Sequence, residues 1–233
     1  MIRVRTLGHC AIQVDSLPIA PDAEMVFAAL LLLTVEPGRR LGRSELLGML
    51  WPEVPAPRAG HCLRQTIYRL RTLGVPLAVE RTHLTLSPEV VDSDVDALLR
   101  IRRPDDIERV ADGIGGPFLP GYAPAFSEPL RDWVERHRDL VTASARRVLV
   151  NAIAMRKARG EWAEVERLAH RCLSIDSLNE DATLALAEVA ALHGGKAEAM
   201  GILDRYLREM GPAAREVRLP AMALRRRIAE PEL

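Results

Sequence analysis

The sequence predicts a mainly α-helical chain with a small β component, in two domains. A length of 233 residues suits two domains better than one. Hydrophobic residues make up 48% of the chain but aromatic residues only 4%, so Leu, Ala and Val must fill the cores, which favours helices. Strand-like alternation is confined to residues 1–91, whereas helical periodicity dominates residues 92–233. We therefore expect a mixed domain followed by a helical one.

The first predicted elements are short strands and one apolar helix. Residues 2–19 alternate apolar and polar side chains around Gly8, which predicts two or three strands. A helix capped by Asp22 follows and continues to Thr34, because the apolar run ends before Pro37-Gly38.

Two more helices and a hairpin complete the first domain. The second helix covers residues 44–50, with Ser44 as its N-cap. The third covers residues 58–73 and closes at Gly74, and residues 76–88 form two alternating strands of a hairpin. Strands, three helices and a terminal hairpin are the parts of a winged helix-turn-helix.

The second predicted domain contains a pair of short helices, a long helix and an internal repeat. The short helices cover residues 94–102 and 104–113. The long helix covers residues 127–158, and its apolar stripe is predicted to contain Trp133, Leu140, Val141, Val148 and Ala152.

The internal repeat follows the long helix. Gly160-Glu-Trp-Ala-Glu aligns with Gly194-Gly-Lys-Ala-Glu at an offset of 34 residues. This period is typical of tetratricopeptide units, which stack because one unit cannot bury its apolar face alone. We therefore predict an α-helical tetratricopeptide-like repeat domain for residues 92–233, with a last helix over residues 217–229.

The third helix has a face with charges of one sign. Leu63, Ile67, Leu70 and Gly74 form its predicted buried stripe. The rest of the surface is polar or cationic, with four arginines and no acidic residue, although the whole chain has zero net charge. Arginine forks match guanine, glutamine can pair with adenine, and other arginines neutralise phosphates. The predicted DNA-binding residues of this helix are Arg58, His61, Arg64, Gln65, Tyr68, Arg69, Arg71 and Thr72.

The tip of the predicted hairpin, Arg81-Thr82-His83, has the composition of a wing that touches the minor groove or phosphate. An ordinary surface turn is the alternative for these three residues. For the helix, the alternative is a solvated amphipathic face, although such faces usually mix both signs of charge.

Several function classes lack a signature. Cys10, Cys62 and Cys172 are widely spaced and odd in number, which indicates neither a disulfide framework nor a zinc site and fits a reducing cytosol. Gly194-Gly-Lys lacks the remainder of a phosphate-binding loop, and no catalytic constellation is found. No apolar run is long enough to span a membrane. We therefore expect a cytoplasmic protein that is no enzyme and needs no cofactor or metal.

Motifs in order along nearly the whole chain resemble a regulator family. Residues 41–52, Leu-Gly-Arg-Ser-Glu-Leu-Leu-Gly-Met-Leu-Trp-Pro, resemble the second helix of the OmpR-type winged helix, and residues 63–71 resemble its recognition helix. The second half resembles the bacterial transcriptional activator domain of SARP (antibiotic regulatory protein) and AfsR-like regulators. Its marks are Phe118-Leu-Pro-Gly121, Trp133-Val-Glu-Arg136, Gly160-Glu-Trp-Ala163 and Asp176-Ser-Leu-Asn-Glu-Asp-Ala182.

The resemblance implies a sequence-specific transcriptional activator. In that family, winged helices bind direct repeats in promoter DNA, and the loop between the second and third helices contacts RNA polymerase and its sigma factor. Here Arg69 matches a base-reading arginine, while Gly60, Cys62 and Tyr68 depart from the family pattern. The loop that matches the polymerase contact consists of Trp51, Pro52, Glu53, Val54, Pro55, Ala56 and Pro57.

Other interpretations stay open at this stage. The chain can be a tetratricopeptide-type interaction scaffold whose winged helix docks protein rather than DNA. A small-molecule sensor in the repeat groove, lined by Trp133, Trp162 and Tyr206, is compatible with the regulator interpretation, although core packing explains these side chains as well. A homodimer, or a further regulatory domain or partner on the repeat domain, is also compatible with it.

Overall fold

The computed structural model describes residues 1–101, 103–211 and 218–230. The chain forms two compact units, which are described separately below. Residues 1–100 and 117–141 make up the first unit, and residues 101–116 and 142–233 make up the second. The boundary predicted between residues 91 and 92 lies inside the first unit by this division.

The first unit begins with a four-stranded sheet in the order β3-β2-β1-β7. β1 (Ile2–Arg5) pairs antiparallel with β2 (Ala11–Val14), which pairs with β3 (Leu17–Ile19). The buried side chains alternate along β1 and β2, as the sequence pattern predicts. The fourth strand, β7 (Val91–Ser93), pairs parallel with β1 and was not predicted.

A carboxylate anchors the chain beyond β7 to this sheet. Asp94 opens α4 (Asp94–Leu99) and accepts hydrogen bonds from the backbone N–H groups of Thr6 at 2.7 Å and Leu7 at 2.8 Å. The same end of β1 receives the segment that follows α5, because Leu119 N–H donates to the Thr6 carbonyl at 2.8 Å. Residues near 117 therefore belong to the first unit.

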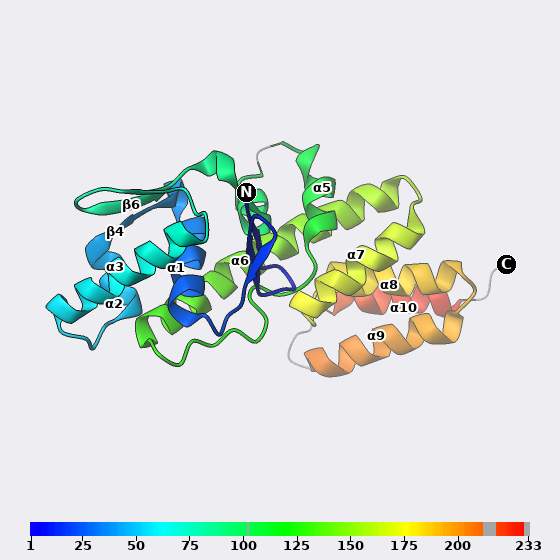
Figure 1. The fold of residues 1–233 in the computed structure, drawn as a ribbon. Helices are drawn as coiled ribbons and strands as arrows, with labels where there is room; N and C mark the ends of the chain where they lie inside the picture. Colours follow the sequence, from blue (N-terminus) through cyan, green and yellow to red (C-terminus); the bar gives the residue numbers. More distant parts are fainter. Residues whose placement is uncertain (102, 212–217, 231–233) are drawn as a thin grey trace. The chain divides into compact units, whose positions relative to one another are not determined.

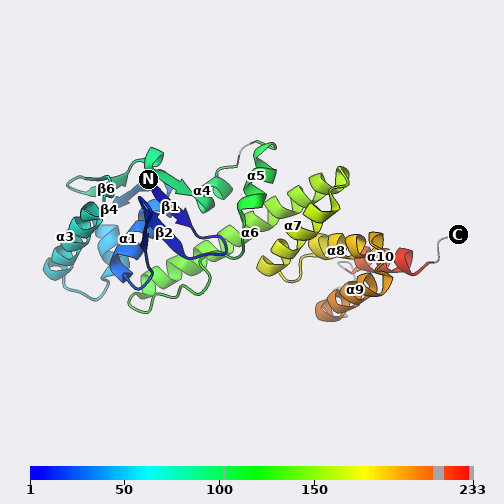
Figure 2. The same ribbon diagram turned by 45° about the vertical axis from the view of Figure 1, so that its right-hand side comes forward.

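Three helices and a second sheet complete the winged helix. α1 (Glu24–Val35), α2 (Arg43–Leu50) and α3 (Ala56–Thr72) contact one another (Figures 1 and 2). α1 is buried along nearly its whole length, which explains its continuous apolar sequence. The second sheet has the order β4-β6-β5, from β4 (Arg40–Gly42), β5 (Leu77–Val79) and β6 (His83–Leu86). Short 3-10 turns cover Pro37–Arg39 and Pro88–Val90.

Two predicted helix caps are wrong. α1 begins after Ala23, with no side-chain cap, so Asp22 does not cap it. Ser44 lies inside α2, whose N-cap is Gly42. There the Glu45 carboxylate accepts the Gly42 N–H at 3.4 Å, so the acidic residue in the first turn satisfies the helix end.

The second unit is helical. It contains α5 (Asp106–Gly113), the end of α6 (Glu128–Ala158) and four further helices. These are α7 (Trp162–Ile175), α8 (Glu180–Leu192), α9 (Lys196–Met210) and α10 (Leu219–Ala229). Successive helices pack on one another, and α7 and α9 begin 34 residues apart, at the predicted repeat spacing. Of the predicted last helix, Val217 lies outside the described residues.

The packing of α6 agrees with the predicted stripe except at one position. Trp133, Val141, Val148 and Ala152 are buried, but 53% of Leu140 is exposed. Leu140 directly precedes the buried Val141, so the turn of about 100° per residue carries it off the buried side.

The aromatic residues of the candidate sensor groove separate into two groups. Trp133 and Tyr206 are buried core residues, in the first and second unit respectively. Trp162 is only half-buried and lines a groove in the second unit with Leu192 and Leu224.

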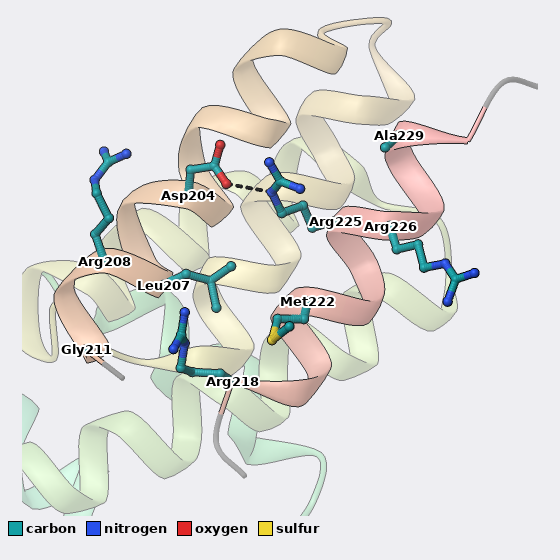
Figure 3. Close-up of a pocket in the computed structure, with 9 residues that line it drawn as sticks. All are labelled: Asp204, Leu207, Arg208, Gly211, Arg218, Met222, Arg225, Arg226 and Ala229. Atoms are coloured by element: carbon teal, nitrogen blue, oxygen red, sulfur yellow. Dashed lines mark hydrogen bonds and ion pairs between the residues drawn. The ribbon is translucent and has the colours of Figure 1, made fainter. Parts of the chain in front are cut away.

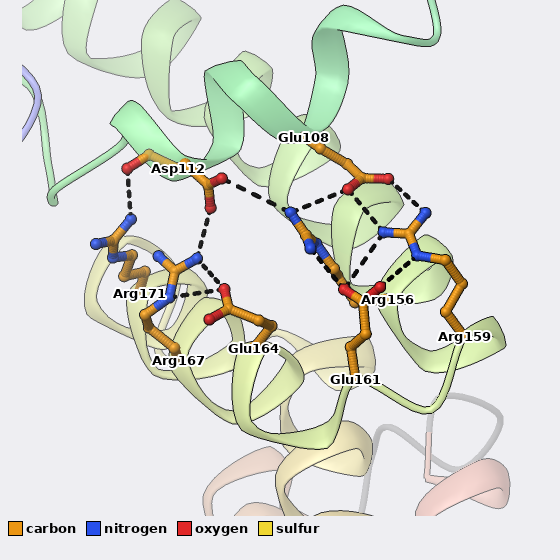
Figure 4. A network of polar contacts seen from close by, with 8 residues as sticks. All are labelled: Glu108, Asp112, Arg156, Arg159, Glu161, Glu164, Arg167 and Arg171. Atoms are coloured by element: carbon orange, nitrogen blue, oxygen red, sulfur yellow. Dashed lines mark hydrogen bonds and ion pairs between the residues drawn. The ribbon is translucent and has the colours of Figure 1, made fainter.

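A network of ion pairs joins α5 to α6 and α7 in the second unit (Figure 4). The Arg159 guanidinium, just past the end of α6, donates to both oxygens of Glu108 at 2.8 and 2.7 Å. Arg156 pairs with Glu108 at 3.0 Å and with Glu161 at 2.5 Å. Hydrogen bonds from Arg159 and then Arg156 lower the pKa of Glu161 to about 2.

The same network continues along α7. Arg167 pairs with Asp112 at 2.5 Å and also with Glu164, and Arg171 donates to the Asp112 carbonyl at 2.7 Å. Four arginines thus face four carboxylates, and every charge in the network has a partner of the opposite sign or a backbone acceptor.

Candidate nucleic-acid interface

The position of α3 follows from its apolar stripe. Leu63, Ile67 and Leu70 are buried as predicted, and α3 contacts α1 and α2 through this side. Gly74 was predicted to belong to the stripe but is exposed. Its φ of +84° shows that it ends the helix in a left-handed conformation, which glycine adopts without strain.

The opposite face of α3 exposes all eight predicted DNA-binding side chains. Tyr68 is 72% exposed, an unusual position for a large aromatic ring. No acidic residue occurs between Glu53 and Glu80. Among the described residues, none of the four arginines makes an ion pair, which leaves their guanidinium groups free to bind an anion. The exposed set is Arg58, His61, Arg64, Gln65, Tyr68, Arg69, Arg71 and Thr72.

Local hydrogen bonds orient three of these side chains. The Gln65 amide nitrogen lies 2.9 Å from Nε2 of His61, one turn earlier. The Thr72 hydroxyl donates to the Tyr68 carbonyl at 3.0 Å, and Arg71 reaches the Leu77 carbonyl of β5 at 3.5 Å. Arg71 therefore leans toward the hairpin, whereas Arg58, Arg64 and Arg69 make no such contact among the described side chains.

The hairpin of β5 and β6 forms the wing. Its turn closes with the Glu80 N–H donating to the His83 carbonyl at 2.9 Å, and Arg81 and Thr82 are exposed at the tip. His83 is half-buried at the start of β6, and its Nδ1 lies 2.8 Å from the Thr82 hydroxyl. Of the three predicted wing residues, His83 is thus the least accessible.

The sequence analysis missed two arginines beside this tip. Arg40 of β4 pairs with Glu80 at 3.5 Å, and the Arg43 N–H donates to the Thr82 carbonyl at 2.8 Å. Both lie there because β4 pairs with β6. A three-residue strand carries too little alternation to be recognised in a sequence. Only their cationic character was visible beforehand.

The loop between α2 and α3 is shorter than predicted. α3 begins at Ala56, so Ala56 and Pro57 belong to its first turn. Trp51 is 9% exposed and ends α2, with its carbonyl accepting the Val54 N–H at 3.2 Å. The ring therefore anchors the loop, while Pro52, Glu53 and Pro55 are exposed.

Within the described ranges, His, Cys, Asp and Glu side chains form no group of three that could hold a metal ion. No helix described there is both long and apolar enough to cross a membrane.

Comparisons with known proteins identify the fold. No family model matches the chain, and no curated protein matches it. Among solved structures, Mycobacterium tuberculosis EmbR, solved in complex with a low-affinity phosphopeptide, matches with a TM-score of 0.64. The match covers 98% of this chain and 68% of the EmbR chain, at 17% sequence identity. The chain has the SARP-like regulator fold. The predicted fold class, a winged helix followed by a helical series, is thereby confirmed.

Proposed function

We propose that this protein is a sequence-specific DNA-binding transcription regulator that uses α3 as its recognition helix. The observation that carries the proposal is the exposed face of α3, on which arginines without acidic partners surround Gln65 and Tyr68. A protein with no net charge needs such a local cationic surface to bind a polyanion.

The chemistry of this face suits base readout as well as phosphate binding. Arg69 lies near the middle of the exposed face and is the candidate for a bidentate contact with guanine. The exposed Tyr68 ring offers apolar contact to a thymine methyl group, and Arg58 and Arg64 are suited to phosphates. At the wing, Arg81, Thr82 and Arg43 are available for the neighbouring backbone.

The polymerase contact is a finer part of the proposal. Its candidate surface is the loop after α2, of which Pro52, Glu53 and Pro55 are exposed and Trp51 is the buried anchor. The likeness to EmbR supports a regulator of the SARP type in general terms. Binding to promoter direct repeats and contact with RNA polymerase and sigma factor remain proposals for this chain.

Selection from fragmented genomic DNA tests the proposal. The purified chain should enrich a small set of upstream regions that share a direct repeat at a spacing of about one helical turn. Arg69→Ala should lose that enrichment while keeping the circular dichroism spectrum and melting temperature of the wild type. Arg136→Ala, at an exposed arginine of α6 with no described ion pair, is the matched control and should enrich the same regions.

Failure has a specific meaning in this experiment. If the folded wild-type chain enriches no region, or if Arg69→Ala enriches the same regions equally well, α3 is no DNA-reading helix. The winged helix would then be better explained as a protein-docking module of an interaction scaffold.

A further inference from the structure

An open groove lies between α9 and α10 in the second unit (Figure 3). Its volume is about 790 Å³, and it runs from the first turn of α10 to its last. α10 has 11 residues, so the groove is roughly 16 Å long at about 1.5 Å per residue. The lining residues are Asp204, Leu207, Arg208, Gly211, Arg218, Met222, Arg225, Arg226 and Ala229.

The floor of the groove is apolar. Figure 3 shows Leu207 of α9 and Met222 of α10 between the two helices. Met222 is 50% exposed, and Leu219, one turn earlier on α10, is 60% exposed. The buried core of the same helix consists of Ala221, Leu224 and Ile228, which face α8 and α9. Exposed apolar side chains that gather beside a core in this way are typical of an interaction site.

The walls of the groove are cationic. Four arginines line it against one carboxylate, and that carboxylate is already used because Arg225 donates to Asp204 at 2.6 Å. Arg226 is 85% exposed and pairs only with Glu230, at 3.4 Å, among the described residues. Arg208 and Arg218 make no ion pair within the described part of the chain, and Nε of Arg218 is buried without a hydrogen-bond partner. α10 itself contains no acidic residue.

We propose that this groove binds an acidic amphipathic segment of a partner protein. The segment would place apolar side chains on Leu207 and Met222 and carboxylates against Arg208, Arg218 and Arg226. Charge complementarity selects an acidic partner, because the lining keeps an excess of positive charge after Asp204 is paired. The apolar floor selects a peptide over a nucleic-acid backbone, which has no apolar side chains to cover Met222. This surface is separate from the α3 face, so the inference does not depend on DNA binding.

Fluorescence anisotropy with the full chain tests the proposal. The probe is a labelled 14-residue helical peptide of leucine and glutamate, with leucine at i, i+3, i+4 and i+7 spacing. It should bind saturably, and a peptide with glutamine in place of every glutamate should bind about tenfold more weakly or worse. Affinity for the glutamate probe should fall as the salt concentration rises.

Two matched double variants locate the site. Arg208→Glu with Arg226→Glu reverses charge on both rims of the groove and should weaken binding of the glutamate probe by about tenfold or more. Arg147→Glu with Arg205→Glu changes two exposed arginines of the same unit that do not line the groove, and should stay within about twofold of wild type. A probe with lysine in place of glutamate should bind the first double variant better than it binds the wild type. Met222→Asp should weaken binding of the glutamate probe without changing the melting temperature.

Four results would overturn the proposal. The first is no saturable binding of the glutamate probe to the folded wild-type chain. The second is an equal loss of affinity in the two double variants. The third is displacement of the probe by a 20-base-pair duplex that itself fails to bind the Arg208→Glu/Arg226→Glu variant, which would make the groove a nucleic-acid surface. The fourth is self-association in sedimentation that disappears in that variant, which would make the occupant a second copy of this chain.

Discussion

Two groups of four arginines in this protein have opposite surroundings. On α3, Arg58, Arg64, Arg69 and Arg71 are exposed and have no acidic partner among the described residues. Where α5, α6 and α7 meet, the arginines 156, 159, 167 and 171 are held by four carboxylates and a backbone carbonyl (Figure 4). The residue type is the same, but the second group is neutralised within the fold and the first is not.

This difference separates structural arginines from candidate binding arginines. A neutralised arginine has its hydrogen-bonding capacity occupied and contributes to the packing of its own unit. An arginine without a partner keeps that capacity for an external anion. The groove between α9 and α10 belongs with α3 in this respect, since Arg208 and Arg218 also lack described acidic partners. The following predictions test the contrast, from the largest expected effect to the smallest.

The two faces of α3 should respond to substitution in opposite ways. Leu63→Ala removes a side chain that is 1% exposed and should lower the free energy of unfolding by about 2–5 kcal/mol. Arg64→Ala, next to it on the exposed face, should change that free energy by less than about 0.5 kcal/mol. Chemical denaturation of both variants measures the difference. Comparable losses in the two variants would mean that Arg64 is structural.

Charge reversal on α3 should abolish DNA binding without unfolding the chain. Arg64→Glu with Arg69→Glu replaces two cations by anions that repel phosphate, so the dissociation constant for selected DNA should rise by about 100-fold or more. Electrophoretic mobility shift at fixed salt measures it. Arg136→Glu should bind like the wild type, and a similar loss in that control would leave only a general charge effect.

Breaking the neutralised network should affect stability and spare DNA binding. Glu108→Gln removes the carboxylate shared by Arg156 and Arg159 and leaves two neighbouring cations. The free energy of unfolding should therefore fall by about 1 kcal/mol, a modest value because the pairs are partly exposed. Glu166→Gln, at an exposed carboxylate of α7 with no described ion pair, is the control. A DNA affinity that drops in Glu108→Gln would contradict the division of roles.

The network should also weaken in acid. The pKa of Glu161 is lowered from 4.5 to about 2 by hydrogen bonds from Arg159 and Arg156. A depressed pKa means that the stabilisation is complete above the unfolded-state pKa and is lost as the pH falls from about 4.5 towards 2. The melting temperatures of the wild type and Glu161→Gln should therefore differ at pH 7 and converge over this range. A constant difference down to pH 2 would show that the ionised carboxylate is not responsible.

Periodicity made much of this fold predictable from the sequence. The 3.6-residue pattern of α3 identified Leu63 and Ile67 as buried and Arg69 as exposed, because one helix face must pack on α1 and α2. The absence of acidic residues between Glu53 and Glu80 identified the cationic face, since no local partner could neutralise it.

Features that depend on long-range pairing could not be predicted. The strands β4 and β7 have three residues each, and their partners lie more than 40 residues away. The return of residues 117–141 to the first unit depends on backbone hydrogen bonds such as Leu119 N–H to Thr6, which no side-chain pattern encodes. The exposure of Met222 was equally hidden, because its sequence neighbours are those of an ordinary amphipathic helix.

The salt dependence of DNA binding tests the central claim most directly. The logarithm of the association constant for a selected duplex is measured against the logarithm of salt concentration, for the wild type and for a variant with alanine at Arg58, Arg64 and Arg69. The account predicts a shallower slope in the variant, by about 0.9 for each phosphate contact that is lost. Equal slopes in the two proteins would contradict it, because the cations of α3 would then make no contact with DNA.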